Sequence, residues 1–172
     1  MLACDHDGIR PDGLVLGKAL GGGLLPVSAF CAREDLMAVF NPGDHGSTFG
    51  GNPLGAAVGE AALTLLEHGP YCETARVQGD YLLASLRRLE HPAITDIRGK
   101  GLLVGVEIDP AFAGARRVCD ALVDEGVLTK DTHGTVVRMA PPLTIAAEQI
   151  DQAVAALGRA LASIEAAEPI AA

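Results

Sequence analysis

Positive charge is scarce in this sequence. Its 172 residues include 13 Lys and Arg against 22 Asp and Glu, which gives a formal net charge of −9. Nucleic acids and anionic membranes bind basic surfaces, and no basic stripe along the chain offsets the negative charge. The composition therefore argues against both as partners. Aromatic residues are also few, at 3%, but the apolar content of 49% is enough for a sizeable core in one domain of ordinary size.

Long hydrophobic runs are missing as well, and no apolar segment reaches the length needed to span a bilayer. The first residues, Met1–Asp7, turn acidic at once, which is unlike a secretory signal. The cysteines are few and scattered, and none forms a C-x-x-C pair; they are Cys4, Cys31, Cys72 and Cys119. We therefore expect a reduced, cytoplasmic protein.

Several motifs for other cofactors and for metals are absent. A Walker A loop needs Ser or Thr after Gly-Lys, but Ala19 and Gly101 follow the two candidate lysines. The turn at Gly99–Gly101 lacks the further glycine of a dinucleotide fingerprint, because Val104 stands in its place. The histidines form no His-Glu-x-x-His motif and share no zinc spacing with cysteine, and Asp5–Asp7 is not a convincing ligand set. We predict no metal site.

The most informative feature that is present is Lys18. It follows the apolar run Leu14–Leu16, which predicts a buried strand, and it precedes three glycines, Gly21–Gly23. Desolvation beside such a strand would lower the pKa of the Lys18 amine, and a neutral amine is a nucleophile toward carbonyl groups. The glycines would let the backbone approach a bound group closely. An ordinary solvated lysine beside a turn is the alternative.

A second glycine cluster, Gly46–Pro53, follows thirty residues later and contains Ser47 and Thr48. Its hydroxyls and free N–H groups lead into a predicted helix start, which is a place where a phosphate binds. A turn that merely caps the helix is the alternative. Taken together, a nucleophilic lysine and a phosphate site predict a phosphate-bearing carbonyl cofactor, pyridoxal 5'-phosphate.

The pattern of apolar residues changes near residue 68. Before that point, the continuous apolar runs Leu14–Leu16 and Val27–Ala32 are typical of strands in a parallel sheet covered on both faces. Asn52 is a good N-cap for a helix over Pro53–His68. After that point, short strands and long helices predict a compact α+β unit. The expected helices are 71–89, 111–125 and 146–165, and the expected strands are 94–97, 102–108, 127–130 and 136–139.

Further motifs stand in order around the two glycine clusters. They are Arg10–Asp12, Pro26–Ala29, Arg98–Leu103, Thr132–Gly134 and Arg138–Leu143. This set, which covers nearly the whole chain, resembles the class III, fold-type I, pyridoxal-phosphate-dependent aminotransferases. The resemblance implies an α/β fold. Residues 1–68 would complete the sheet of the large cofactor-binding domain, and residues 69–172 would form the α+β C-terminal small domain.

The family's chains are more than twice as long as this one, and the resemblance covers their C-terminal part. It implies that other cofactor-binding groups belong to an N-terminal half: the aspartate that bonds the pyridine nitrogen, the aromatic that stacks on the ring and a glycine-rich turn for the phosphate. We therefore expect the chain to need a separate N-terminal half and a homodimer-like assembly. A catalytically inactive remnant, or a module that docks on aminotransferase-like partners, is the alternative.

The resemblance also implies roles for single residues. Lys18 would be the catalytic lysine that bonds covalently to the cofactor and then moves a proton of the substrate. Ser47 and Thr48 would contact the cofactor phosphate across a dimer interface, and Thr48 is the better candidate. Arg138 would bind substrate carboxylates; because it lies in an apolar strand, we also expect an acidic partner for it. A purely structural ion pair is the alternative for Arg138. Lys100 and His133 match family motifs, but we assign them no catalytic role.

The implied reaction is amino transfer between an amino acid and a 2-oxo acid. The segments around Thr132–Gly134 and Arg138 are most similar to members of the family that act on ornithine. These members move its δ-amino group to 2-oxoglutarate, which gives glutamate semialdehyde and glutamate. Members that act on acetylornithine or on 4-aminobutyrate are the alternatives.

Overall fold

The computed structural model describes residues 1–167, which divide into two compact units between Pro70 and Tyr71. The boundary predicted from the sequence lies two residues earlier, between 68 and 69. The assignment of these units to a large cofactor-binding domain and a small domain stays a prediction.

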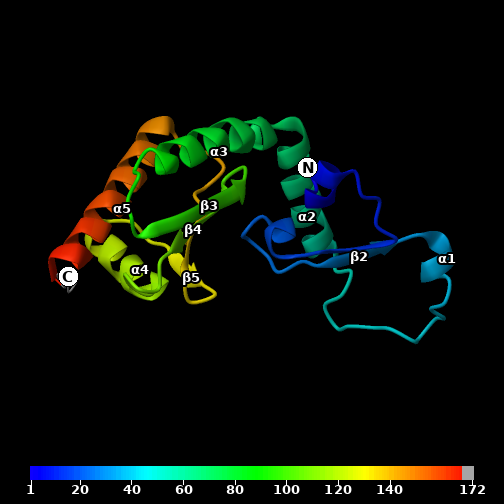
Figure 1. Ribbon diagram of the computed structural model, residues 1–172. Helices are drawn as coiled ribbons and strands as arrows, with labels where there is room; N and C mark the ends of the chain where they lie inside the picture. The colour runs from blue at the N-terminus through cyan, green and yellow to red at the C-terminus, as the bar shows by residue number, and fades with distance from the viewer. Residues whose placement is uncertain (168–172) are drawn as a thin grey trace. The chain divides into compact units, whose positions relative to one another are not determined.

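The first unit contains short elements and one long helix (Figure 1). They are η1 (Ala3–Asp7), β1 (Gly13–Leu16), η2 (Lys18–Gly21), β2 (Ala29–Ala32), α1 (Glu34–Met37) and α2 (Pro53–His68). The predicted start of α2 is confirmed: the Gly55 N–H donates to Oδ1 of Asn52 at 2.7 Å, and Pro53 takes the first helical position. This cap fixes where the Ser47–Thr48 loop meets the helix.

The strands β1 and β2 form a two-stranded antiparallel ribbon in which Val15 lies opposite Phe30. The expectation of parallel strands covered on both faces is wrong for this pair. A continuous apolar run does not specify strand direction, and the connection between the strands holds only a 3₁₀ turn in place of a crossover helix. Val15 and Phe30 remain 77% and 53% exposed, so the described residues leave an apolar surface on the ribbon.

The second unit is a four-stranded antiparallel sheet with three helices (Figure 1). The strand order is β3 (Ile94–Lys100), β4 (Leu103–Ile108), β6 (Val136–Met139) and β5 (Lys130–Thr132). The helices are α3 (Tyr71–Arg87), α4 (Ala115–Asp124) and α5 (Ala147–Ala167). The α+β prediction for this part of the chain is confirmed. The hydrophobic core of the described residues lies entirely here, between Leu82 and Ile164.

Strand alternation gives this sheet one covered face and one open face. On β4 the side chains of Val104, Val106 and Ile108 are buried in the core, whereas Leu103 and Glu107 point to the other side. The three helices cover only the core face, because the buried residues of all three pack in the same cluster. The open face is therefore available for polar side chains.

Two predicted elements are displaced. The helix expected from residue 111 begins at Ala115, because Asp109 accepts a hydrogen bond from the Ala111 N–H at 2.8 Å and forms a turn before the helix. The strand expected at 127–130 is instead β5, which begins at Lys130 and pairs with β6.

Candidate active site

Lys18 follows β1 after a single residue, Gly17, and begins the 3₁₀ turn η2. Its φ angle is +49°, in the left-handed region that residues other than glycine rarely adopt. Such a conformation persists only where the surrounding structure holds it, and it is most common at functional sites. The burial expected around Lys18 is wrong for this chain: the lysine is exposed, because β1 belongs to an open ribbon.

Two small residues of α2 hold the segment that carries Lys18. A Cβ atom added to Gly59 would lie 3.7 Å from the carbonyl oxygen of Leu20, so η2 packs directly on the helix at that point. One turn later, Gly22 lies close to the methyl group of Ala62 and has a φ of +60°. Gly22 and Gly23 both have a positive φ, so the backbone conformation after Lys18 favours glycine at these positions. The packing on α2 positions the lysine relative to that helix.

A cavity of about 380 Å³ lies where the Ser47 loop meets the start of α2. Its walls include Ser28, Ser47 and Asn52 together with glycine backbone. The Ser47 hydroxyl accepts a hydrogen bond from the Gly50 N–H at 3.1 Å, which fixes the loop. The first N–H groups of α2 are mostly used within the chain, because Pro53 has none and those of Gly55 and Ala56 bond to Asn52. The hydroxyls of Ser28 and Ser47 are the donors in the lining that suit a phosphate group. The donor set therefore fits the phosphate end of a phosphorylated cofactor.

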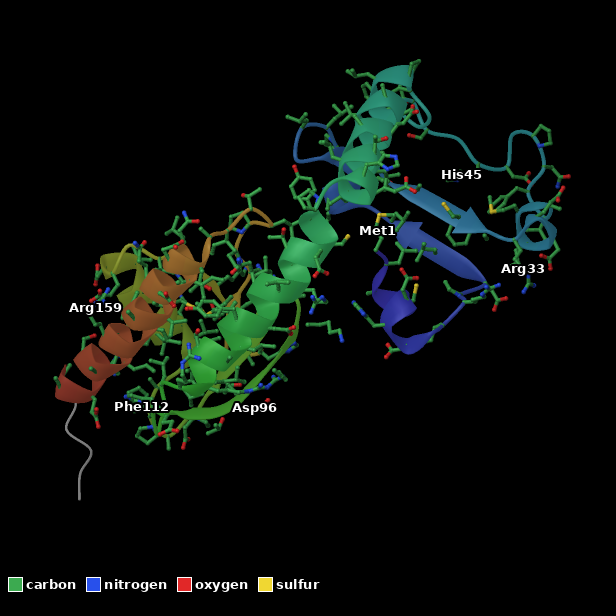
Figure 2. The ribbon with its side chains drawn as sticks, turned by 90° about the horizontal axis from the view of Figure 1, so that it is seen from above. Met1, Arg33, His45, Asp96, Phe112 and Arg159 are labelled. Atoms are coloured by element: carbon green, nitrogen blue, oxygen red, sulfur yellow. The ribbon has the colours of Figure 1, made fainter. Side chains whose placement is uncertain are left out.

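The cavity does not gather all the predicted residues of the first unit. Neither Lys18 nor Thr48 belongs to its lining. Figure 2 labels His45 in the long loop that leads to Ser47, and residues 39–51 of this loop are exposed throughout. Gly17, the residue before Lys18, lies close to Ser28 of the lining, but the lysine itself is not part of the cavity.

Arg138 belongs to the second unit and lies on β6 between the buried residues Val137 and Met139. Those two side chains pack in the core, so Arg138 points to the open face and is exposed. Among residues 1–167 the Arg138 side chain has no ion pair and no side-chain hydrogen bond, so the expected acidic partner is not found there and stays a prediction. Because side chains alternate between the two faces of a strand, the Arg138 side chain lies in solvent, where a charge needs no partner.

A cluster of charges that sequence reasoning missed lies beside Arg138. On β3, Arg98 donates to Asp96 at 2.7 Å and to Glu107 of β4 at 2.8 Å (Asp96 is labelled in Figure 2). The Thr135 hydroxyl and the Arg98 guanidinium hold the pKa of the Glu107 carboxyl below its usual range. The alternation of side chains along the strands is the sequence signal that could have revealed this cluster. Residues 96 and 98 of one strand share a face with Glu107 of the next strand.

His133 and Lys100 remain without a catalytic role. His133 has a φ of +53° and forms, with Gly134, the turn between β5 and β6. Lys100 ends β3 and is exposed. Within residues 1–167 no three His, Cys, Asp or Glu side chains come together as a set of metal ligands.

The class of protein follows from comparison with known families. The family model for class III aminotransferases matches residues 1–161, and the chain belongs to that family. The chain is 50% identical over 152 residues to an ornithine aminotransferase of Halalkalibacterium halodurans, a match that covers 88% of this chain and 37% of that one. An ornithine aminotransferase of Bacillus subtilis is 49% identical over 152 residues, with the same coverage.

Solved structures agree with this assignment and confirm the predicted fold class. The ornithine aminotransferase of Toxoplasma gondii superposes with a TM-score of 0.90 at 41% identity, over 97% of this chain and 40% of that one. The ornithine aminotransferase of Plasmodium yoelii superposes with a TM-score of 0.89 at 38% identity, over 95% of this chain and 44% of that one. The chain thus spans about two fifths of the length of the relatives it matches. None of the helices in residues 1–167 is apolar enough over a sufficient length to cross a bilayer.

Proposed function

We propose that this chain is the C-terminal part of an ornithine aminotransferase. The complete enzyme moves the δ-amino group of ornithine to 2-oxoglutarate and gives glutamate semialdehyde and glutamate. The observation that carries this proposal is the 46–50% identity to ornithine aminotransferases over 88–95% of the chain. Its cofactor is pyridoxal 5'-phosphate, which class III aminotransferases use; a Toxoplasma gondii relative contains it at the active site in partial occupancy.

The role proposed for Lys18 is to hold the cofactor and to move a proton. When bound, the cofactor supplies an electron sink that stabilises negative charge at the carbon bearing the amino group. With the cofactor bound, the Nζ atom of Lys18 would hold it at its carbonyl group. When the substrate amine occupies that position, the free Lys18 amine would act as the base that takes the proton from the reacting carbon. The left-handed backbone at Lys18 and its packing on α2 support a fixed position for this amine.

Ser47 and Thr48 are proposed to bind the phosphate of the partner subunit's cofactor in a homodimer. Two observations support a site shared between subunits. The loop carries the hydroxyls of Ser47 and Thr48 just before the start of α2, and Lys18 does not line the cavity that Ser47 lines. Both observations are explained if one cofactor molecule is held by Lys18 of one chain and its phosphate is bound by Ser47 of the other chain.

Arg138 is proposed to bind a substrate carboxylate. Its planar guanidinium can donate two parallel hydrogen bonds to a carboxylate. The side chain is exposed on the open face and has no acidic partner within residues 1–167, so it is available for a ligand. Its backbone is held by neighbours buried in the core.

A separate N-terminal half is proposed as the partner of the first unit. Several large apolar side chains of this unit are exposed, and they belong to the ribbon and the connection between its strands, to the Thr48 loop and to α2. They include Val15 (77%), Leu24 (84%), Phe49 (80%) and Leu54 (64%). An apolar surface of this kind is expected to be covered by another part of the protein.

Co-expression with the N-terminal half of a relative's ornithine aminotransferase tests the reaction. The purified pair is supplied with 2-oxoglutarate and, in parallel, with ornithine, N-acetylornithine or 4-aminobutyrate. We expect formation of glutamate with ornithine as the preferred donor, and none from the chain alone. A solved acetylornithine aminotransferase of Elizabethkingia anophelis, 41% identical with a TM-score of 0.86, makes N-acetylornithine the second candidate. If none of the three donors is turned over, the result would favour an inactive remnant or a docking module.

A further inference from the structure

A row of basic side chains crosses the open face of the sheet in the second unit. The register of the strands places Arg98 opposite Gly105, Gly105 opposite Arg138, and Arg138 opposite Lys130. Residues directly opposite each other in antiparallel strands point to the same face, with Cβ atoms about 5 Å apart. The order across β3, β4, β6 and β5 is therefore arginine, glycine, arginine, lysine.

Only one end of this row is neutralised. Arg98 pairs with Asp96 and Glu107 at 2.7 and 2.8 Å. Arg138 and Lys130 are both exposed, and within residues 1–167 neither side chain has an ion pair or a side-chain hydrogen bond. Like charges directly opposite each other in a sheet reduce its stability. An anion bound between them removes this cost.

The geometry suits a ligand above the sheet at Arg138. The arginine lies on an interior strand, and the Thr129 hydroxyl donates to its carbonyl oxygen, so its backbone is well fixed. Gly105 beside it has no side chain, and the Val136 side chain covers that position, because a Cβ atom added to Gly105 would lie 3.0 Å from Cγ1 of Val136. Lys130 lies on the edge strand with a flexible stem, and its ammonium group can reach a ligand held by Arg138.

We propose that Lys130 is a specificity-determining residue that acts with Arg138 to select a dicarboxylate. This inference rests on the proposed function for the role of Arg138. Two adjacent cations favour a dianion over a monoanion, because each carboxylate can meet its own positive charge. The lysine therefore serves the half-reaction that uses the dicarboxylic substrate.

Binding of simple acids to the full chain tests this proposal without cofactor or turnover. Glutarate, butyrate and inorganic phosphate are titrated into ¹⁵N-labelled chain, and the backbone amide signals of β5 and β6 are followed by NMR. We expect glutarate to bind more tightly than butyrate and phosphate. Lys130→Gln should weaken glutarate binding about three- to tenfold and change butyrate binding by less than twofold, whereas Lys130→Arg should retain the preference.

Lys100→Gln is the matched control, because it removes the same charge from an exposed lysine of the same sheet but two strands away from Arg138. It should leave the affinity for glutarate unchanged. An equal loss in both variants, no preference of the wild type for glutarate, or tighter binding of phosphate would overturn the proposal. A chain that shows this preference but no aminotransferase activity in any assembly would contradict the proposed function and not the specificity of the anion site.

Discussion

At the scale of single residues, the neighbours of Arg138 decide what it can do. The sequence shows an arginine among apolar residues and suggests a buried charge. In the structure, Val137 and Met139 enter the core and the arginine takes the opposite face. The sequence could not separate these cases because Val136, on the same face as Arg138, is also apolar and buried. The exposure of Arg138 could be predicted only once the strands that pair with β6 were known.

Glu107 gives a prediction about acid stability. Its pKa is lowered in the folded chain, first by the Thr135 hydroxyl and then by Arg98, so folding favours its carboxylate form. The resulting stabilisation is present above the ordinary pKa of about 4.3 and is lost as the pH falls through the lowered value. Thr135→Val should therefore lower the midpoint of urea unfolding at pH 7, and the difference from wild type should shrink toward zero below pH 4.

Thr132→Val on the neighbouring strand is the control for this measurement, because Thr132 does not bond to the Glu107 side chain among the interactions of residues 1–167. Its effect should show no dependence on pH between 3 and 7. A loss in Thr135→Val that stays constant over the same range would mean that the hydroxyl acts through packing and not through the carboxylate.

At the scale of elements, the sequence predicted those parts whose signals are local. The N-cap Asn52 with Pro53 located the start of α2, and the apolar periods of the last helix located α5. The direction of β2 and the start of β5 could not be predicted, because strand pairing depends on residues distant in the sequence. For the same reason the sequence could name Lys18, Ser47 and Arg138 but could not arrange them in space.

The contact between α3 and the turn after β3 gives a second prediction. A Cβ atom added to Gly79 would lie 2.3 Å from the backbone of Gly101, which cannot move away as a side chain can. Gly79→Ala should therefore destabilise the chain by about 1–3 kcal/mol in urea unfolding. In Gly158→Ala of α5 the new methyl group would meet only the flexible end of Leu89, at 3.4 Å. That variant should be neutral or up to about 1 kcal/mol more stable. Equal effects of the two substitutions would contradict the packing described here.

At the scale of the whole molecule, burial is distributed very unequally. The buried residues of the first unit are three glycines, Gly21, Gly55 and Gly59, whereas the core of residues 1–167 lies in the second unit. Stability follows buried apolar area, so the two units should differ in resistance to opening. This difference fits a first unit that needs a partner to cover it.

Limited proteolysis of the isolated chain tests the difference between the units. The exposed loop between α1 and α2 should be cut first, followed by the segment around Lys18. A stable fragment that begins near residue 70 should remain, and its amide hydrogens should exchange slowly with solvent. Uniform protection from Leu14 onward would contradict this prediction and would indicate a chain that covers its first unit by self-association.

The most direct test of the account asks which lysine bonds to the cofactor. The chain is assembled with the N-terminal half of an ornithine aminotransferase, incubated with pyridoxal 5'-phosphate and reduced with borohydride, and the labelled peptide is identified by mass spectrometry. We predict a label at Lys18 that requires the N-terminal half, is unchanged in Lys100→Ala and is absent from Lys18→Ala. A label at Lys100 or Lys130 in the assembled protein, with Lys18 unmodified, would contradict the assignment of this chain's active site.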